Sequence, residues 1–322
     1  MPAPSTPSLG TRRFDWLRQI AAWFDSSAGV VETEPDRIDW LRVVPFVALH
    51  VACLAVLSVG VSSVSVGVAI GLYALRMFAV TAFYHRYFSH RAFKTSRTLQ
   101  FVFAALGASA VQRGPLWWAA HHRHHHAHAD RPKDPHSPRQ HGFLWSHMGW
   151  FLARANFPTK RELVPDLTRY PELQALDRFD AAVPALLALA LFGTGAVLER
   201  VAPGFGTDGL QMLVWGFAVS TVAVWHATFA INSLAHTIGR RPHATRDDSR
   251  NHLGLALLTF GEGWHNNHHR YPSSARQGFR WWEIDVTYYL LCALAAAGLV
   301  WDLRAVAAAL RTGGVEIGRA HV

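Results

Sequence analysis

Long apolar runs alternate along the chain with polar, arginine-rich stretches. Four runs are long enough to cross a bilayer, namely residues 43–61, 64–83, 181–201 and 210–231. A helix rises about 1.5 Å per residue and needs about 20 apolar residues to cross a hydrocarbon core of about 30 Å. Two shorter runs, residues 99–111 and 288–301, predict helices that are buried or lie at the membrane interface. The pattern therefore predicts an all-α integral membrane protein with four transmembrane helices.

The residues between the spans indicate the topology. Short connections join the first run to the second and the third run to the fourth, which predicts two helical hairpins. The long segment between the hairpins, residues 85–180, is rich in arginine and lysine, and so is the segment after residue 240. By the positive-inside rule, both termini and the central segment face the cytoplasm. In a bacterium this membrane would be the inner membrane.

The two ends of the chain lie outside these spans. Residues 1–40 lack the short apolar core of a secretory signal peptide. Their arginines stand among aromatic residues, a pattern typical of a helix at a membrane surface, although an unstructured tail fits it nearly as well. We expect residues 41–305 to form the functional domain and residues 306–322 a C-terminal tail.

The composition agrees with a membrane protein. Of the 322 residues, 50% are hydrophobic and 16% are charged, whereas a soluble domain has about 25% charged residues. The net charge of +9 follows mainly from the expected topology, so we expect no nucleic-acid partner. With two cysteines, Cys53 and Cys292, the chain holds neither a disulfide scaffold nor a four-cysteine zinc or iron–sulfur site.

Histidine is unusually abundant, with 20 residues, and half of them fall in four clusters. The clusters are HRYFSH at residues 85–90, HRHHH at 122–126, NSLAH at 232–236 and HNNHH at 265–269. Each lies at or beyond the expected cytoplasmic end of a span, so all four can meet at one depth in a cytoplasmic helical cap.

The spacing within the clusters indicates which side chains can converge. On an α-helix His122, His125 and His126 lie at roughly 0°, −60° and +40°, on one face broad enough to serve two neighbouring metals. Residues 265–269 repeat this pattern, and residues 232 and 236 are four apart. His85 and His90 are about 140° apart on an α-helix, which predicts that this cluster runs from the end of a span into a turn or a second short helix.

Without His124, which points away from the face of its triad, the clusters supply nine imidazoles and the amide of Asn232, the natural count for two metal ions with four or five ligands each. Imidazole suits iron, zinc, copper and nickel, so the donor type leaves the metal open. Outside the clusters, the histidines predicted to be structural are His50, His141, His147, His226, His243, His252 and His321. Those predicted to support the ligands or handle protons are His121, His124 and His128.

At these clusters the sequence resembles the membrane fatty acid desaturases, specifically the acyl-CoA Δ9 (stearoyl-CoA-type) family. HRYFSH fits the HRxxxH box of that family, HRHHH fits HRxHH, and NSLAH fits NSxxH. The segment GEGWHNNHHRYP, residues 261–272, fits GEGxHNxHHxxP, and DPH at residues 134–136 also matches. The resemblance extends from about residue 40 to residue 305.

The resemblance implies a non-haem di-iron centre that uses O2 and two electrons to introduce a cis double bond, Δ9 in this family, into a saturated acyl-CoA. The implied ligands are His85, His90, His122, His125, His126, His236, His265, His268 and His269, with Asn232 acting through a water molecule. No acid, base or nucleophile activates an alkane carbon, so a metal oxidant and tight positioning of the acyl chain are required. In this family the acyl chain lies in a bent, closed tunnel.

Candidate substrate contacts surround the second box. The tryptophans Trp117, Trp118 and Trp264 suit tunnel walls, and simple packing explains them equally well; His136 in the DPH motif is a further candidate. Where animal members carry polar residues for the CoA headgroup, Gln112 and Trp118 fit the family pattern, whereas Arg113, Ala120 and His121 do not. An acyl-lipid or acyl-carrier-protein substrate therefore stays open.

The electrons are expected from an external donor, a ferredoxin-like or cytochrome b5-like protein with its reductase, because neither terminus is long enough for a fused haem domain. A di-iron hydroxylase or a desaturase of other regiochemistry is the nearer alternative. A metal transporter is the remote one. It would place paired ionisable ligands at mid-membrane, but only His50 and His226 lie within the predicted spans.

Overall fold

The computed structural model describes residues 20–21, 23–26 and 37–306. The membrane-surface helix predicted around Arg12, Arg13 and Arg18 lies outside the described residues, and so does the tail from residue 307 onward.

Among the residues that the structure describes, four helices are long and apolar enough to cross a membrane, as the sequence predicts. They are Trp40–Val59, Ser63–Ser89, Ala182–Val201 and Gly209–His236. The second and fourth are longer than the apolar runs that predicted them, because each continues into a histidine cluster. The first span consists of α3 (Trp40–Cys53) and α4 (Val56–Val59), and the second of α5 (Ser63–Phe78) and η2 (Ala79–Ser89). The third span is α10 (Ala182–Val201). The fourth consists of α11 (Gly209–Gln211), η8 (Met212–Val219), α12 (Ser220–Ser233) and η9 (Leu234–His236).

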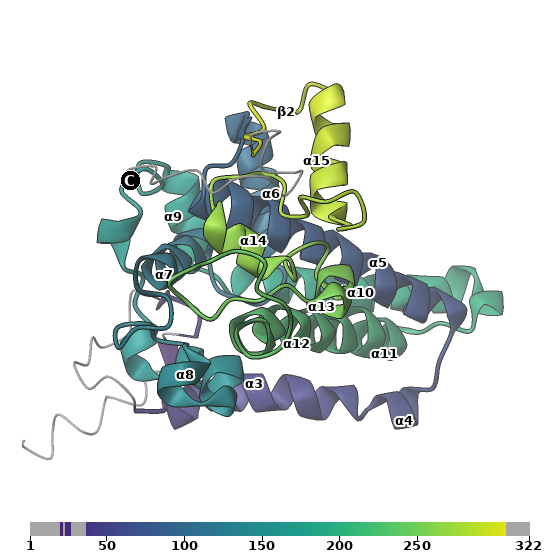
Figure 1. Ribbon diagram of the computed structural model, residues 1–322. Coiled ribbons are helices and arrows are strands. Elements are labelled where there is room, and N and C mark those ends of the chain that lie inside the picture. Colours follow the sequence, from purple (N-terminus) through teal and green to yellow (C-terminus); the bar gives the residue numbers. More distant parts are fainter. Residues whose placement is uncertain (1–19, 22, 27–36, 307–322) are drawn as a thin grey trace, which may run out of the picture.

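The fourth span is the central one. Its π-helical part η8 packs against α3, α5 and α10, and Figure 1 shows these helices running in a common direction. Gly195 permits the close approach of α10, since a Cβ there would lie 2.2 Å from the carbonyl oxygen of Asp208. At the other side, Ser62 caps α5 and its hydroxyl lies 2.7 Å from that of Thr207. The connection between the first two spans is thus fixed to the connection between the last two.

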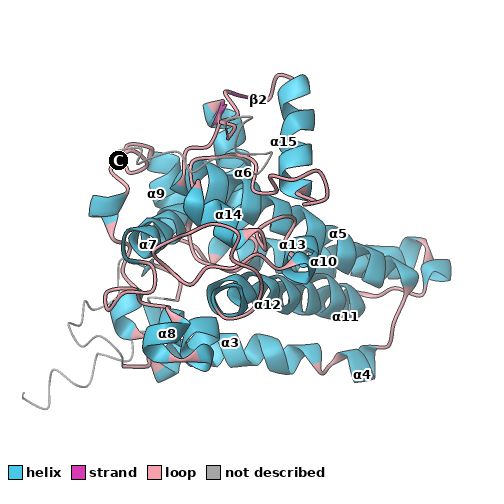
Figure 2. Ribbon diagram, in the orientation of Figure 1, coloured by secondary structure: helices cyan, strands magenta, loops and turns pink. Residues whose placement is uncertain are grey.

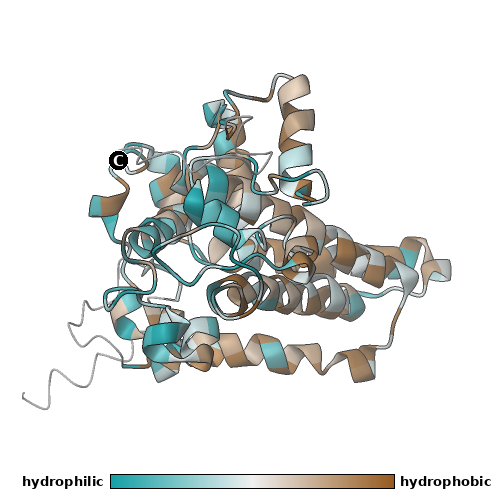
Figure 3. Ribbon diagram, viewed as in Figure 1, coloured by the Kyte–Doolittle hydropathy of each residue, from teal (hydrophilic) through white to brown (hydrophobic). Residues whose placement is uncertain are grey.

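Shorter elements gather at one end of the spans and form a cap (Figure 1). They are α6 (Arg97–Ala108), α7 (Pro115–His128), α8 (Pro138–His141), η3 (Trp145–Gly149), η4 (Trp150–Leu152), η5 (Arg154–Asn156), η6 (Arg161–Leu163), α9 (Pro171–Arg178), α13 (Leu253–Leu258), α14 (His265–Arg270) and α15 (Val286–Ala296). The short helix η7 (Pro203–Phe205) lies instead in the connection between the third and fourth spans. Colouring by hydropathy shows the spans mainly apolar and the cap helices α7, α8 and α14 mainly polar (Figure 3).

The two short apolar runs form helices as predicted, with one correction. Residues 99–111 become α6, but the run 288–301 is helical only to Ala296. Gly298 then adopts a φ of 72°, and the chain turns back so that Val300–Trp301 pairs with Lys94–Thr95 in antiparallel strands β2 and β1. The left-handed conformation that glycine permits ends the helix, so the fold contains one small sheet (Figure 2).

The main apolar core lies where the second span enters the cap. Phe83, Tyr84, Phe88 and Phe93 are almost completely buried there, and the ring of Phe83 stacks on that of Phe103 at 3.9 Å between centroids. Because η2 packs against α6 and α7, this core holds the first and second histidine clusters together.

Candidate metal centre

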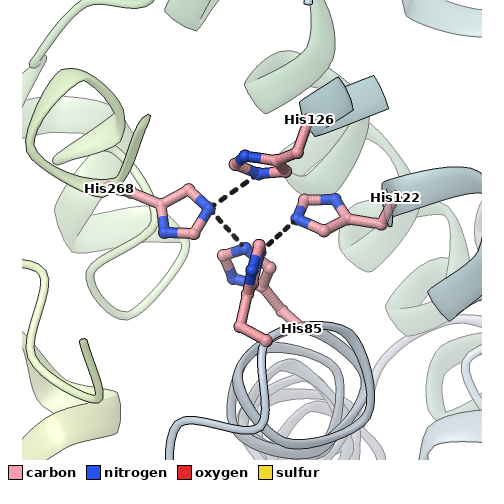
Figure 4. Close-up of side chains that lie close together, drawn as sticks. His85, His122, His126 and His268 are labelled. Atoms are coloured by element: carbon pink, nitrogen blue, oxygen red, sulfur yellow. Dashed lines mark hydrogen bonds between the residues drawn. The ribbon is translucent and has the colours of Figure 1, made fainter. Parts of the chain in front are cut away.

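The histidines of the four sequence clusters converge into two groups that could each hold a metal ion. Cluster A contains His85, His90, His122, His126 and His268, and cluster B contains His125, His236, His265 and His269. Within each group the ligand nitrogens all lie within 4.8 Å of one another. Figure 4 shows four histidines of cluster A pointing toward one another from η2, α7 and α14.

His85 reaches cluster A together with His90 because the end of the second span is a π-helix. The backbone N–H of His90 donates to the carbonyl oxygen of His85 at 3.3 Å, which is the five-residue repeat of π-winding. This repeat brings residues five apart to one face. The box thus runs from the end of the second span into a turn at His90, as predicted, although the span ends in a π-helix instead of an α-helix.

The two identical triads each serve both clusters. On α7, His122 and His126 belong to cluster A and His125 to cluster B. On α14, His268 belongs to cluster A, whereas residues 265 and 269 belong to cluster B. The broad face predicted for each triad thus contributes to both sites, and the helices α7 and α14 connect clusters A and B.

The ring nitrogens face one another at the spacing expected of ligands on one ion. In cluster A, Nε2 of His268 lies 3.0 Å from that of His85 and 2.9 Å from that of His126. In cluster B, Nε2 of His265 lies 3.0 Å from those of His236 and His269. Two nitrogens at about 2.1 Å from one ion, at right angles to each other, are about 3.0 Å apart.

Carboxylates fix the rings from behind. Nδ1 of His125 lies 2.9 Å from Asp134, Nδ1 of His236 lies 2.8 Å from Asp130, Nδ1 of His269 lies 3.1 Å from Asp247, and Nδ1 of His85 contacts Glu262. Each Nδ1–H donates to its carboxylate, so Nε2 carries the lone pair. In cluster B the lone pairs of residues 236 and 269 both face His265, and its single Nε2 can satisfy only one of them by donating a proton. The donor set therefore fits a bound cation.

Electrostatics keep the cluster histidines that lie outside the spans ready to bind a metal. Burial, with help from neighbouring histidines, holds the pKa values of His90, His122, His126, His265 and His268 well below 6.5. Burial also lowers the pKa of His269 to about 4, although Asp247 raises it. For Asp134, burial would raise the pKa, but the charge and hydrogen bond of His125 hold it below its ordinary value. Neutral rings and ionised carboxylates are the protonation states that metal binding requires.

Glu262 connects cluster A to a buried ion network. It contacts His85 and accepts from Nη2 of Arg86 at 3.1 Å. Arg86 also donates to Asp285 at 3.0 Å from Nη2 and at 3.2 Å from Nη1. All three charged side chains are almost completely buried, so the orientation of the His85 ring depends on a network that reaches the start of α15.

A cavity of about 390 Å³ opens beside cluster A, and His122 forms part of its wall. Most of its wall is aromatic or aliphatic, with residues from α3, α7, α12 and the segment 150–157; examples are Phe46, Leu49, Trp117, Trp118, Trp150, Phe151, Phe157, Trp225 and Phe229. Two hydrogen-bonded polar side chains, those of Gln112 and Thr228, lie in the wall of this cavity. Gln112 donates to the hydroxyl of Thr228 at 2.9 Å and accepts from the indole of Trp118 at 3.4 Å. Trp118 in turn stacks on the ligand His122 at 5.0 Å.

Most of the predicted substrate contacts line this cavity. They are Gln112, Arg113, Trp117, Trp118 and His136, and Asn232 lines it too. Arg113 is paired with Asp180 at 2.9 Å. Trp264 is placed elsewhere, because its indole donates to the carbonyl oxygen of Ile284 at 2.7 Å and its ring packs edge-on against Trp282.

The supporting carboxylates and part of the cavity wall escaped the sequence analysis. Asp134 and Glu262 lie in motifs that matched the family pattern, which is a signal that could have found them. Asp130 and Asp247 carry no such signal, since they come from loops. The cavity wall contributed by α3, including Arg42 and Phe46, comes from a span that the sequence treats only as a membrane helix.

The other histidines lie outside both clusters. Three of those predicted to be structural form one chain, in which Nε2 of His50 and Nε2 of His147 each lie 3.0 Å from a different nitrogen of His226. This chain links α3, α12 and η3. His124 contacts the carbonyl oxygen of Lys133 at 2.9 Å, and His121 packs against Trp117 in the cavity wall. His321 lies outside the described residues.

Comparisons with known proteins agree with this geometry. Residues 62–307 match the family model described as fatty acid desaturase. An sn-1 stearoyl-lipid 9-desaturase of Synechocystis is 38% identical over 267 residues, 82% of this chain and 80% of the relative. A hex-5-enoyl-acyl-carrier-protein acetylenase of Moorena producens is 35% identical over 82% of this chain and 84% of its own. An icosanoyl-CoA 5-desaturase of Limnanthes douglasii is 41% identical over 66% of this chain, and the match spans 57% of that relative.

Proposed function

The chain belongs to the fatty acid desaturase family, and we propose that it introduces a cis double bond into a saturated fatty acyl chain at two iron ions held by clusters A and B. The observation that carries this proposal is the convergence of nine imidazoles beside an apolar cavity. In the overall reaction two hydrogen atoms leave adjacent methylene carbons and combine with O2, two electrons and two protons to give two water molecules.

The residues fit two ions of a metal that accepts imidazole. His85, His90, His122, His126 and His268 would hold one, and His125, His236, His265 and His269 the other, with Asn232 placed to hold a water molecule in the cavity. When bound, the irons supply the oxidising power to break an unactivated C–H bond, which no protein side chain can supply.

The chain itself positions the substrate and keeps water away. An apolar cavity of this size binds an acyl chain by burying its methylene groups, and one wall of it is the ligand His122. Gln112 and Thr228 place polar groups within the wall, so the acyl chain must pass around them. We propose that this bend selects a cis product, and that the distance along the cavity selects the Δ9 position. A dry cavity also protects the reacting carbons from competing reactions.

For the carrier of the acyl chain, we propose a membrane lipid ester first. The support is the stearoyl-lipid 9-desaturase, which matches over 80% of its length, together with Ala120 and His121, which depart from the pattern of acyl-CoA desaturases. The acyl-CoA substrate that the histidine boxes predict is the second candidate, favoured by the similarity to an icosanoyl-CoA desaturase.

The basic segments of the cap support a cytoplasmic location for the clusters and both termini. We propose that a ferredoxin-like or cytochrome b5-like donor and its reductase deliver electrons there. A redox carrier with an acidic surface would suit the arginine-rich cap.

The test is expression of the full chain in a host that lacks this activity, followed by analysis of the iron content of the purified protein and of double-bond positions in the host lipids. We expect two irons per chain and O2-dependent cis-Δ9 products, lost in His122→Ala and His268→Ala. His128→Ala is the matched control: the sequence predicts a supporting role for His128, but in the structure it lies on α7 outside both clusters, and its Nδ1 contacts the carbonyl oxygen of His124. Full activity in the two ligand variants would contradict the di-iron proposal, and hydroxylated products would favour a hydroxylase. Supplying acyl-CoA or acyl-lipid to the purified enzyme decides the carrier.

A further inference from the structure

The helix α15 is apolar on every side, yet little of it is buried. Its sequence, Val286–Ala296, contains no charged residue, and only Thr287 and Leu291 are buried. These two residues are four apart and mark the one face that packs on the protein. Leu290 keeps 40% of its surface exposed, and Cys292 is exposed as well. A helix that is apolar all round is stable only when something apolar covers it.

The length and direction of α15 fit a membrane surface. With 11 residues, the helix is about 16 Å long, and a bilayer core is about 30 Å thick. In Figure 1 it stands across the direction of α5 and α12, which belong to membrane-spanning helices. A helix that is perpendicular to the spans lies along the membrane plane, where its exposed side can rest among lipids without crossing them.

Both ends of α15 carry residues suited to lipid headgroups. Trp281 and Trp282 precede the helix with 88% and 41% of their surfaces exposed, and Trp301 follows it with 44% exposed. Arg280 and Arg304 flank these tryptophans and are exposed. Tryptophan prefers the headgroup level of a bilayer, and arginines near the surface are attracted to anionic lipids.

The exposed apolar surface continues onto the second span. The hydroxyl of Thr287 lies 2.7 Å from that of Thr81 in η2. On α5, Tyr73 donates to the carbonyl oxygen of Leu258 at 2.6 Å, and Leu258 keeps 58% of its surface exposed. The exposed residues of α15 and α13 therefore lie beside the second span and form one apolar surface with the side of that span that lipid would cover.

We propose that residues 281–301 form a membrane-surface anchor, in which the exposed side of α15 is covered by lipid acyl chains on the cap side of the membrane and the flanking tryptophans and arginines lie among the headgroups. The buried contacts give this anchor a consequence for the metal centre. Asp285 caps α15 by accepting from the amide of Tyr288 at 3.0 Å, and it binds Arg86, which binds Glu262 behind His85. The anchor thus fixes the height of cluster A above the bilayer.

The native Cys292 provides a probe for this proposal. The full-length Cys53→Ala variant is labelled at Cys292 with an environment-sensitive fluorophore and reconstituted into vesicles of phosphatidylcholine and phosphatidylglycerol that contain nitroxide groups near the top of the acyl chains. The control carries Ala175→Cys with both native cysteines replaced by alanine, because Ala175 is an exposed position on α9 of the cap. Equal elution and equal melting temperatures before labelling show that both variants are folded.

We expect the nitroxides to quench the label at Cys292 at least about twofold more than the label at position 175, since an interfacial helix sits about 5–10 Å into the boundary between headgroups and acyl chains. Equal quenching at the two positions would overturn the proposal. An unquenched label, together with a Cys292–Cys292 disulfide between copies of the unlabelled variant under oxidising conditions, would overturn it too, because a second copy of the chain would then be what covers α15. Fluorescence quenching does not depend on activity or on iron, so its result tests the membrane anchor independently of the desaturase proposal.

Discussion

The carboxylate of Asp130 accepts a hydrogen bond from Nδ1 of His236 at 2.8 Å. Asp130 follows α7, whereas His236 ends the fourth span, so this contact holds the cap to the membrane helix that supplies a ligand of cluster B. Both side chains are buried. The carboxylate keeps the proton on Nδ1 and turns the lone pair of Nε2 toward the cluster.

Removing this carboxylate should weaken metal binding in cluster B. Loss of a supporting partner behind a ligand histidine typically lowers metal affinity by about 10–100-fold, so we expect Asp130→Ala to lose iron at a correspondingly lower chelator concentration. We expect the iron affinity of Asp130→Asn to lie between those of Asp130→Ala and the wild type, because an amide oxygen still accepts from Nδ1 of His236. Glu162→Ala, at an exposed acidic position, serves as the control. Chelator titration followed by metal analysis measures the effect, and unchanged iron retention in Asp130→Ala would contradict this role.

The two clusters should lose their ions separately. His90→Ala removes a ligand of cluster A, and His236→Ala removes a ligand of cluster B. We expect each variant to retain about one iron per chain and to be inactive, because the remaining cluster keeps its own ligands while the reaction needs both. Metal analysis of the purified variants tests this directly. Two irons in either variant would show that the replaced histidine is not a ligand.

The polar group in the cavity wall should control the product. Thr228→Val keeps the shape of the side chain but removes the acceptor that binds the amide of Gln112 at 2.9 Å. A buried donor without a partner costs about 1–3 kcal/mol, so the amide is expected to turn away and change the path of the cavity. The expected result is a slower reaction with a mixture of double-bond positions, measured by mass spectrometry of the products. An unchanged product at an unchanged rate would exclude this group from positioning the acyl chain.

Gly114 should be essential for the placement of α7. It precedes this helix with an ordinary φ of −80°, so its importance is steric. A Cβ at this position would lie 2.3 Å from the Cα of Asp177, and relief requires α7 and its three ligand histidines to move away from α9. We expect Gly114→Ala to lower stability by about 1–3 kcal/mol and to lower the iron content, whereas Gly142→Ala, with open space around it, should keep its iron although its positive φ makes alanine unfavourable there. Normal iron content and melting temperature in Gly114→Ala would show that the helix tolerates the shift.

Asp177 should give the stability of the protein a measurable pH dependence. Burial raises the pKa of its carboxyl above the ordinary 3.8, although the amide of Trp117 and the hydroxyl of Thr159 favour the ionised form. The folded state therefore holds this proton more tightly than the unfolded state, and the contribution of Asp177 to stability falls as the pH rises from about 4 through the raised pKa.

Asp177→Asn removes this titration and can still accept from the amide of Trp117. The difference in melting temperature between the variant and the wild type should therefore grow in favour of the variant from pH 4 to pH 7. Thermal melts of the purified protein in detergent measure it. A difference that stays constant over this range would show that Asp177 does not titrate there.

The sequence by itself determined the features that depend on local periodicity. The length of the apolar runs identified four helices able to cross a membrane, since a span requires a minimum number of apolar residues. The α-helical spacing of the second and fourth boxes placed each triad on one broad face, and the structure shows each such face shared by clusters A and B. The box motifs also identified the fatty acid desaturase family, which the family match confirms.

The tertiary structure decided the features that depend on contacts between distant segments. His85 and His90 share a cluster because the end of the second span is wound as a π-helix, which the α-helical spacing of the sequence does not predict. Asp130 and Asp247 became ligand supports because loops far from their histidines in sequence fold against them. Trp264 does not line the cavity for the same reason, because its side chain contacts Trp282 and Ile284 in the segment before α15. Periodicity fixes which residues share a face of one helix, whereas packing decides which faces meet.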